Sequence, residues 1–216
     1  MNEKPFVIVA WGDSIAANNG RPEQGWPAMC ELTTAVVTST GRRVTIRNEG
    51  VCGMPAAQAV LEFETRVKAH DPDLVFIQFG ANDVRYEQGH GGRPLSTEAE
   101  FTQHMTAMIR ACHEGTRARV IVFGYHRPRR HFRFPNGLTY QEAFARYNAL
   151  AAEAAAACGA EFYDLSRALP YDDYEWKELV CEDGVHLSAT GNHAYADFAA
   201  NLILRCLQNK QSKGKA

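Results

Sequence analysis

The sequence lacks several features that would place it in other classes of protein. No apolar run approaches the ~20 residues that a bilayer-spanning helix needs, so we expect no membrane span. The six cysteines include no Cys-x-x-Cys pair, which gives no support to a zinc or redox site. The 23 Lys and Arg residues nearly balance the 25 Asp and Glu residues, leaving a formal net charge of −2. A net charge this close to zero gives no long-range electrostatic attraction to nucleic acid, so we expect no nucleic-acid partner.

The first residues also lack a secretion signal. Residues 1–5 show no basic start, apolar middle and small-residue cleavage site, and the chain then runs directly into an apolar stretch at Phe6. We therefore expect a cytoplasmic protein. The length of 216 residues fits one domain, which we place at residues 1–208, followed by a flexible polar tail at residues 209–216.

What the sequence contains is a regular alternation of apolar strands and amphipathic helices. This pattern predicts an α/β protein, a three-layer α/β/α domain with a five-stranded parallel sheet. Right-handed crossovers favour a doubly wound, flavodoxin-like topology. Two capping boxes, Thr97 with Glu100 and Thr139 with Glu142, mark helix starts, and Gly159 marks a helix end. The expected strands are 6–11, 43–47, 74–79, 120–123 and 161–164, and the expected helices are 25–39, 55–68, 97–115, 139–158 and one that starts after residue 188.

Candidate functional residues follow three of these strands and recur near the C-terminus. Ser14 lies in a Gly-Asp-Ser turn directly after the first strand, while Gly53 and Asn82 lie in segments after the second and third. Asp183 and His186 form an Asp-x-x-His block. The Gly-Asp-Ser tripeptide alone is more often a simple turn. In a parallel sheet, however, the loops after the strands share one edge, so these four segments can meet there.

These residue types suit nucleophilic acyl transfer. A serine hydroxyl becomes a nucleophile when a base accepts its proton, and His186 can be that base, oriented by Asp183. The backbone N–H groups of Ser14 and Gly53 and the side-chain amide of Asn82 can donate to the oxyanion of a tetrahedral intermediate. We therefore predict Ser14, Asp183 and His186 as catalytic residues and Ser14, Gly53 and Asn82 as an oxyanion hole.

The set resembles the GDSL-type esterases, also called the SGNH hydrolase family. That family is named for a Ser, a Gly, an Asn and a His in four separate blocks, which map here to Ser14, Gly53, Asn82 and His186. The resemblance spans residues 6–205 and implies a serine esterase that needs no cofactor and no metal. Two departures, Trp11 and the Met-Pro pair at residues 54–55, are expected to reshape the acyl pocket.

Other α/β enzymes fit the sequence less well. The turn around Ser14 ends in alanine rather than the second glycine of a Gly-x-Ser-x-Gly nucleophile elbow. The sequence has no Gly-Lys-Ser/Thr of a P-loop, and no Gly-x-Gly-x-x-Gly follows the first strand.

Some residues have a functional and a structural interpretation. We name Asp13, Asp83, Arg127 and Arg129 as candidate substrate contacts, although the carboxylates of the two aspartates can instead brace their loops. The segment 125–138 alternates arginines with aromatic residues. It could be a rim that grips an anionic or sugar-like substrate, an oligomer contact or a solvated loop. We expect solvated side chains for the loop histidines His90, His126 and His131, and a packed or surface position for His193.

The sequence thus predicts a serine esterase that hydrolyses a small carboxylic ester through an acyl-enzyme. A short acyl group, such as acetyl on a carbohydrate, is the expected substrate. The alternatives are an acyltransferase, a lysophospholipase or a thioesterase at the same site, or a non-catalytic binding module that uses the arginine-rich segment. The oligomeric state stays open.

Overall fold

A parallel sheet forms the middle layer of the computed structural model, which describes residues 4–30, 43–87, 92–169 and 178–213, with side chains up to residue 208. Its strand order is β2-β1-β3-β4-β5, and all neighbouring strands are parallel. This is the predicted doubly wound, flavodoxin-like order. The strands are β1 (Phe6–Gly12), β2 (Val44–Asn48), β3 (Leu74–Gln78), β4 (Arg119–Gly124) and β5 (Glu161–Asp164).

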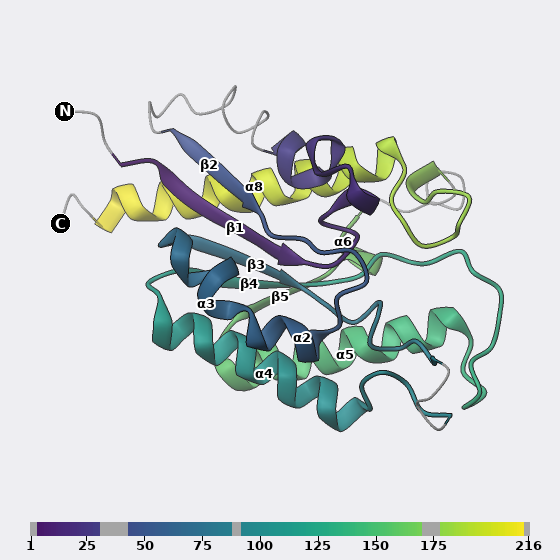
Figure 1. The fold of residues 1–216 in the computed structure, drawn as a ribbon. Coiled ribbons are helices and arrows are strands. Elements are labelled where there is room, and N and C mark those ends of the chain that lie inside the picture. Colours follow the sequence, from purple (N-terminus) through teal and green to yellow (C-terminus); the bar gives the residue numbers. More distant parts are fainter. Residues whose placement is uncertain (1–3, 31–42, 88–91, 170–177, 214–216) are drawn as a thin grey trace.

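Helices cover both faces of the sheet (Figure 1). In that view α8 and the short helical turns after β1 lie on one side of the sheet, and α2 to α5 lie on the other. The described α-helices are α2 (Ala56–Leu61), α3 (Phe63–Arg66), α4 (Glu98–Gly115), α5 (Tyr140–Cys158), α6 (Leu165–Ala168) and α8 (Ala189–Lys213); the 3₁₀ turns are η1 (Asn18–Gly20), η2 (Pro22–Gln24) and η3 (Lys68–His70).

The predicted helix ends are confirmed where local side chains determine them. Thr97 and Glu100 form a reciprocal capping box at the start of α4, and Thr139 and Glu142 do the same for α5. Gly159 ends α5 in the left-handed conformation, with φ of 70°. The starts of α4 and α5 thus end the long segments that follow β3 and β4 at the carboxyl edge of the sheet. Gly159 begins the short connection from α5 to β5.

Three expectations differ from the structure or fall outside it. The single helix expected at 55–68 is broken into α2, α3 and η3. Between α2 and α3, Glu62 leaves helical geometry at φ −103° and ψ 9°. A helix begins at residue 26 as expected, but residues 31–42 lie outside the described part of the chain. The tail expected at 209–216 overlaps α8, which continues to Lys213, while residues 214–216 are not described.

Aromatic side chains fill the core on both faces of the sheet. On one face Trp11 packs against Phe79 and Phe63, at ring-centroid distances of 5.8 and 6.1 Å. On the other face Trp26 packs between Phe76 and Tyr195, at 5.8 and 6.4 Å. Trp11 is 1% exposed, so the expectation that it reshapes an acyl pocket is wrong. Large buried rings of this kind hold the strands, and therefore their carboxyl ends, in fixed positions.

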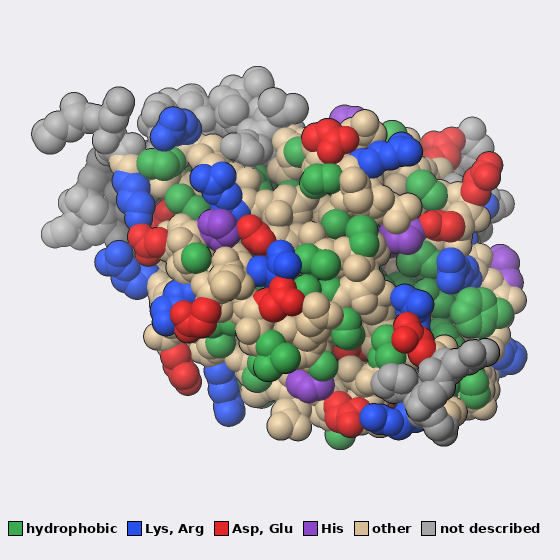
Figure 2. All heavy atoms as spheres, in the orientation of Figure 1, with side chains coloured by type: hydrophobic (Ala, Val, Ile, Leu, Met, Phe, Trp, Pro, Cys, Tyr) green, Lys and Arg blue, Asp and Glu red, His purple; other side chains and the backbone are tan. Residues whose placement is uncertain are grey.

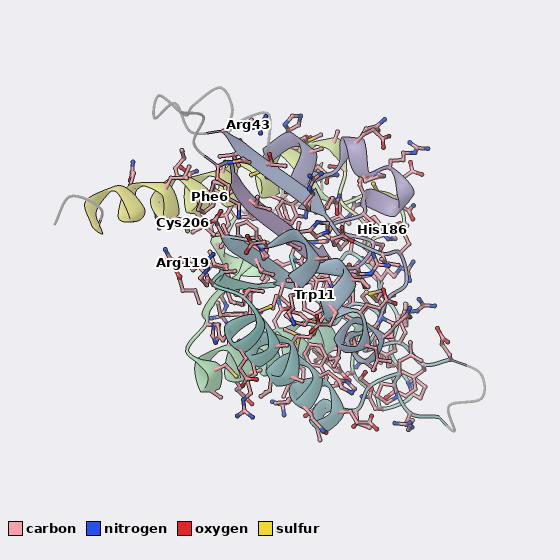
Figure 3. All side chains as sticks on the ribbon, turned by 60° about the vertical axis from the view of Figure 1, so that its left-hand side comes forward. Phe6, Trp11, Arg43, Arg119, His186 and Cys206 are labelled. Atoms are coloured by element: carbon pink, nitrogen blue, oxygen red, sulfur yellow. The ribbon has the colours of Figure 1, made fainter. Side chains whose placement is uncertain are left out.

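His186 and the start of β1 lie at opposite ends of the molecule (Figure 3). Figure 3 places His186 at one end of the molecule and Phe6, Arg119 and Cys206 near the other. On the face drawn in Figure 2, basic and acidic side chains are interspersed among hydrophobic ones. None of the helices in the described ranges has the length and apolar character that crossing a bilayer requires.

Candidate active site

Ser14 stands in a tight turn at the carboxyl end of β1. Gly12 ends the strand where a Cβ would lie 3.1 Å from the carbonyl oxygen of Gln78 on the neighbouring strand. The carboxylate of Asp13 then accepts the N–H of Ile15 at 3.0 Å, and the carbonyl of Asp13 accepts the N–H of Ala17 at 3.0 Å. Sterics and these two bonds together turn the chain and present the Ser14 hydroxyl at the sheet edge.

The segment after β2 is fastened directly onto this turn. The N–H of Val51 donates to the carbonyl of Gly12 at 3.0 Å, and the side chain of Asn48 donates to the carbonyl of Ala16 at 2.8 Å. A Cβ at Gly50 would lie 2.4 Å from the backbone nitrogen of Ala17, so the position admits only glycine without a backbone shift. This close contact carries the chain to Gly53, which has φ of 79°.

The structure joins Ser14, His186 and Asp183 by hydrogen bonds. Nε2 of His186 lies 2.9 Å from Oγ of Ser14, across 172 residues of sequence. Nδ1 of His186 lies 2.5 Å from Oδ2 of Asp183. Because the ionised carboxylate can only accept, Nδ1 carries the proton of a neutral ring and Nε2 is free to accept from the serine hydroxyl.

The carboxylate of Asp183 is held by its own loop. Its Oδ1 accepts the N–H groups of Val185 and His186, at 2.8 and 2.9 Å. Burial raises the pKa of Asp183, but the hydrogen bonds from the His186 ring and these N–H groups outweigh burial, so the pKa lies below its usual 3.8. Asp183 is therefore ionised at neutral pH and can orient the imidazole.

The three predicted oxyanion donors differ in whether they already donate to an acceptor within the protein. In the described part of the chain, no protein acceptor is recorded for the N–H of Ser14 or of Gly53. The amide nitrogen of Asn82 donates to Oδ2 of Asp13 and to the carbonyl of Met54, both at 3.2 Å. Both contacts are long for N–H···O bonds. Asn82 therefore has to exchange one of them if it is to donate to an oxyanion.

Asp13 and Asp83 brace the site from behind. Both are 0% exposed, so the prediction that they contact substrate is wrong: neither carboxylate reaches the surface. Asp13 accepts the Tyr125 hydroxyl at 2.6 Å, while Asp83 accepts the Ser96 hydroxyl at 2.6 Å and the N–H of Ala56 at 3.1 Å. Burial raises the pKa of Asp13 from 3.8 to about 6, against the lowering effect of its hydrogen bonds, and burial also raises the pKa of Asp83.

The arginine-rich segment packs on the loop of Asp183 rather than standing free in solvent. The N–H of Arg129 donates to the carbonyl of Gly184 at 2.7 Å, and its guanidinium lies 3.5 Å from the carbonyl of Val180. His131 is exposed as expected, but His126 is 1% exposed, so its expected solvation is wrong. His193 is exposed, and His90 lies outside the described residues.

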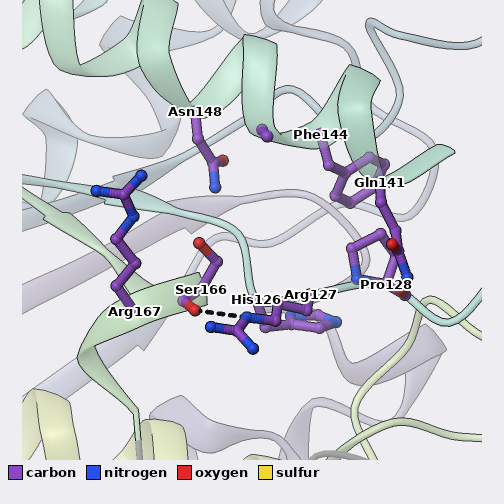
Figure 4. Close-up of a pocket in the computed structure, with 9 residues that line it drawn as sticks. His126, Arg127, Pro128, Gln141, Phe144, Asn148, Ser166 and Arg167 are labelled. Carbon is purple, nitrogen blue, oxygen red and sulfur yellow. Dashed lines mark hydrogen bonds between the residues drawn. The ribbon is translucent and has the colours of Figure 1, made fainter. Parts of the chain in front are cut away.

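Two cavities lie near this edge of the sheet. One, of about 690 Å³, includes Asp183 and His186 in its wall together with the amide side chains of Asn18, Asn19 and Gln24. The other, of about 430 Å³, lies beside α5 and contains Arg127, whose Nε donates to the carbonyl of Ser166 at 2.9 Å (Figure 4). Neither Ser14, Asp183 nor His186 lines this second cavity, so the structure does not bring Arg127 to the predicted catalytic residues.

Several residues that hold the site were not assigned a supporting role from the sequence. Tyr125 and His126 directly follow β4, at the same edge as the other segments, and that placement is the signal that could have found them. Asn192 accepts the N–H of Trp26 at 2.9 Å and donates to Asn18 at 3.1 Å. Nothing local in the sequence marks this role of Asn192, because Trp26 and Asn18 lie more than 160 residues away.

The sequence matches the model of a known protein family over most of its length. The model of the GDSL-like lipase/acylhydrolase family matches residues 10–194, and the chain belongs to this family. Within the described residues, no group of three or more His, Cys, Asp or Glu side chains is arranged to hold a metal ion.

Individual proteins are similar to this chain in sequence or in fold. An arylesterase from Vibrio mimicus is 32% identical over 83 residues, which cover 38% of this chain and 38% of that protein. The chain spans about two fifths of the length of the curated relatives that it matches. The crystal structure of a lipase/acylhydrolase from Enterococcus faecalis superimposes with a TM-score of 0.70 at 24% identity, covering 94% of this chain and 96% of that one. A mutant of an acetylxylan esterase from Geobacillus stearothermophilus gives a TM-score of 0.69 at 17% identity, covering 95% and 96%.

Proposed function

We propose that the protein is a serine esterase that hydrolyses a small carboxylic ester through an acyl-enzyme. The observation that carries the proposal is the continuous chain from Ser14 Oγ to His186 Nε2 at 2.9 Å and from His186 Nδ1 to Asp183 Oδ2 at 2.5 Å. A nucleophile, a base and an orienting group in hydrogen-bond contact are what acyl transfer requires.

In the proposed reaction, Oγ of Ser14 attacks the ester carbonyl while its proton passes to Nε2 of His186. The tetrahedral oxyanion accepts hydrogen bonds from the N–H groups of Ser14 and Gly53, and from Asn82 once that side chain releases Met54 or Asp13. His186 then protonates the leaving alcohol as the bond to it breaks. Water, deprotonated by His186, attacks the acyl-enzyme and releases the acid and free Ser14.

We propose an alcohol portion rich in hydroxyl groups, such as an acetylated carbohydrate. The cavity of about 690 Å³ beside His186 supports this substrate class, because its wall offers the amides of Asn18, Asn19 and Gln24 and the guanidinium of Arg21. The leaving alcohol has to lie next to His186 to receive its proton. The name of the acetylxylan esterase with the same fold agrees with this choice. The cytoplasmic location stays a prediction.

Replacement of the nucleophile tests the proposal. Ser14→Ala is expected to lower hydrolysis of p-nitrophenyl acetate by about 10⁴-fold or more, because the remaining groups cannot form the acyl-enzyme. Circular dichroism should show an unchanged fold, since Ser14 is a partly exposed turn residue. Product analysis with an acetylated sugar then separates hydrolysis from acyl transfer. Wild-type rates in Ser14→Ala would refute the assignment.

A further inference from the structure

The segment that follows β4 lies along the loop that carries Asp183 and His186. Three consecutive carbonyls of this loop accept hydrogen bonds from it. Nε of Arg130 donates to Asp183 at 2.8 Å, the N–H of Arg129 donates to Gly184 at 2.7 Å, and Nε2 of His126 contacts the carbonyl of Val185 at 2.8 Å. The backbone between the two proposed catalytic side chains is thus held at each peptide unit.

His126 is fixed from both sides. Its Nδ1 lies 2.7 Å from the hydroxyl of Tyr195 on α8, and its ring is 1% exposed. The carbonyl of Val185 can only accept, so Nε2 carries the proton and Nδ1 accepts from the tyrosine hydroxyl. The neutral ring therefore links the Tyr195 hydroxyl on α8 to the backbone carbonyl of Val185, the residue before His186.

Arg130 and Gly184 pack against each other on the other side of the loop. Gly184 has φ of 75°, and a Cβ there would lie 3.0 Å from both the backbone nitrogen and Cγ of Arg130. The guanidinium of Arg130 lies 5.5 Å from the ring centroid of Tyr140, which stacks on Phe134 at 5.3 Å. Phe134 in turn stacks on Tyr86 at 5.5 Å. Arg130 is exposed, but its guanidinium is thus held against one end of a row of rings.

We propose that His126 and Arg130 are positioning residues that hold Asp183 and His186 in register with Ser14. The proposal rests on the proposed esterase function. The Asp183 loop is irregular, and a displacement of about 1 Å at a reacting group can cost about 10²-fold in rate. Fixing its carbonyls preserves the 2.9 Å contact between His186 and Ser14 on which the proton transfer depends.

The first test replaces His126 by phenylalanine or glutamine. Phenylalanine fills the space but removes the donor to Val185, and we expect kcat for p-nitrophenyl acetate to fall by about 10²-fold while KM stays within about two-fold. Glutamine keeps a side-chain N–H at about the reach of Nε2, and we expect it to recover most of the lost kcat. The rate at which a fluorophosphonate labels Ser14 should follow kcat in both variants.

The second test compares two arginines of the same segment. Arg130→Met removes the bond to Asp183, and we expect kcat to fall by about tenfold with little change in KM. Arg133→Met is the matched control, because Arg133 donates within its own loop to the carbonyl of Gly137 at 2.8 Å. Its kcat should equal that of the wild type.

The outcomes separate the two proposals. Activity that survives Ser14→Ala contradicts the esterase assignment itself. If Ser14→Ala is inactive but His126→Phe and Arg130→Met keep wild-type kcat and labelling rates, the positioning role is overturned. A loss that appears in KM alone also overturns it, because that result indicates substrate contact. Should His126→Phe fail to fold, Arg130→Met and Tyr195→Phe decide the question by the same readouts.

Discussion

Asp13 connects the turn that carries Ser14 to the other parts of the candidate site. Its Oδ1 holds the N–H of Ile15, and its Oδ2 accepts both the hydroxyl of Tyr125 and the amide of Asn82. One buried carboxylate thereby sets the positions of the Ser14 turn and of a proposed oxyanion donor. Such a side chain can be essential to the geometry without touching the substrate.

Removal of the Asn82 amide tests its proposed role at the level of a single residue. Asn82→Ala is expected to lower kcat for p-nitrophenyl acetate by about 10²- to 10³-fold, the effect of losing one oxyanion donor. Asn201→Ala is a suitable control, since Asn201 is an exposed residue of α8 that donates to the carbonyl of Asp197. A loss below tenfold would mean that the N–H groups of Ser14 and Gly53 suffice.

At the scale of elements, the loops after β1 and β2 behave as one unit. Gly50 lies against the backbone of Ala16 and Ala17, where a Cβ would approach within 2.9 Å or less. Glu49 reinforces the same loop from outside, with an ion pair to Arg66 at 3.1 Å and a hydrogen bond with His70 at 2.8 Å. The position of Gly53 relative to Ser14 therefore depends on this contact between loops.

Gly50→Ala tests that dependence. The added methyl group forces the two loops apart, and we expect a loss of about 1–3 kcal/mol in the free energy of unfolding together with a lower kcat. Gly159→Ala is the control: it strains a left-handed helix end with nothing within 4 Å, far along α5 from the site. It should cost about 1 kcal/mol and leave kcat unchanged. Equal kcat in both variants would contradict the coupling of the loops.

Local signals predicted most elements, and tertiary contacts decided the rest. The capping boxes of Thr97 and Thr139 and the apolar strands are readable because the residues that determine them are neighbours in sequence. The break at Glu62 is not readable, because it brings Phe63 onto Trp11, a contact set by the sheet. In the same way Ser14 and His186 could be found from their strand-end and motif positions. The burial of His126 could not, since it depends on Tyr195 and Val185.

At the scale of the whole molecule, two buried groups couple stability to pH with opposite signs. Burial lowers the pKa of His126 from 6.5 to about 4, so the stability it contributes is complete above 6.5 and is lost as the pH falls toward 4. Burial raises the pKa of Asp13 from 3.8 to about 6, so its ionisation destabilises the fold as the pH rises from 3.8 through 6. Between pH 4 and 6 the two effects oppose each other.

A variant that removes one of the two groups should show the pH dependence of the unfolding free energy that the other group causes. Relative to wild type, His126→Gln should gain stability as the pH falls from 6.5 to 4, and Asp13→Asn should lose stability over the same range. Each difference should be about 3 kcal/mol at most, from about 1.4 kcal/mol per pKa unit. Urea unfolding at pH 4.5 and pH 7 measures it. Parallel pH profiles for wild type and both variants would show that neither group is buried as described.

The fold as a whole brings together two residues that are far apart in the sequence. Ser14 follows β1 and His186 precedes α8, and their contact at 2.9 Å exists only because both belong to the carboxyl edge of the same sheet. The central claim is that this contact makes Ser14 the residue that carries the acyl group.

Covalent labelling measures that claim most directly. The wild-type protein is treated with a fluorophosphonate, digested, and mapped by mass spectrometry. We predict one adduct, on the peptide that contains Ser14, with labelling absent in Ser14→Ala and strongly slowed in His186→Ala. An adduct on another residue, or ester hydrolysis that continues after Ser14 is fully labelled, would contradict the claim.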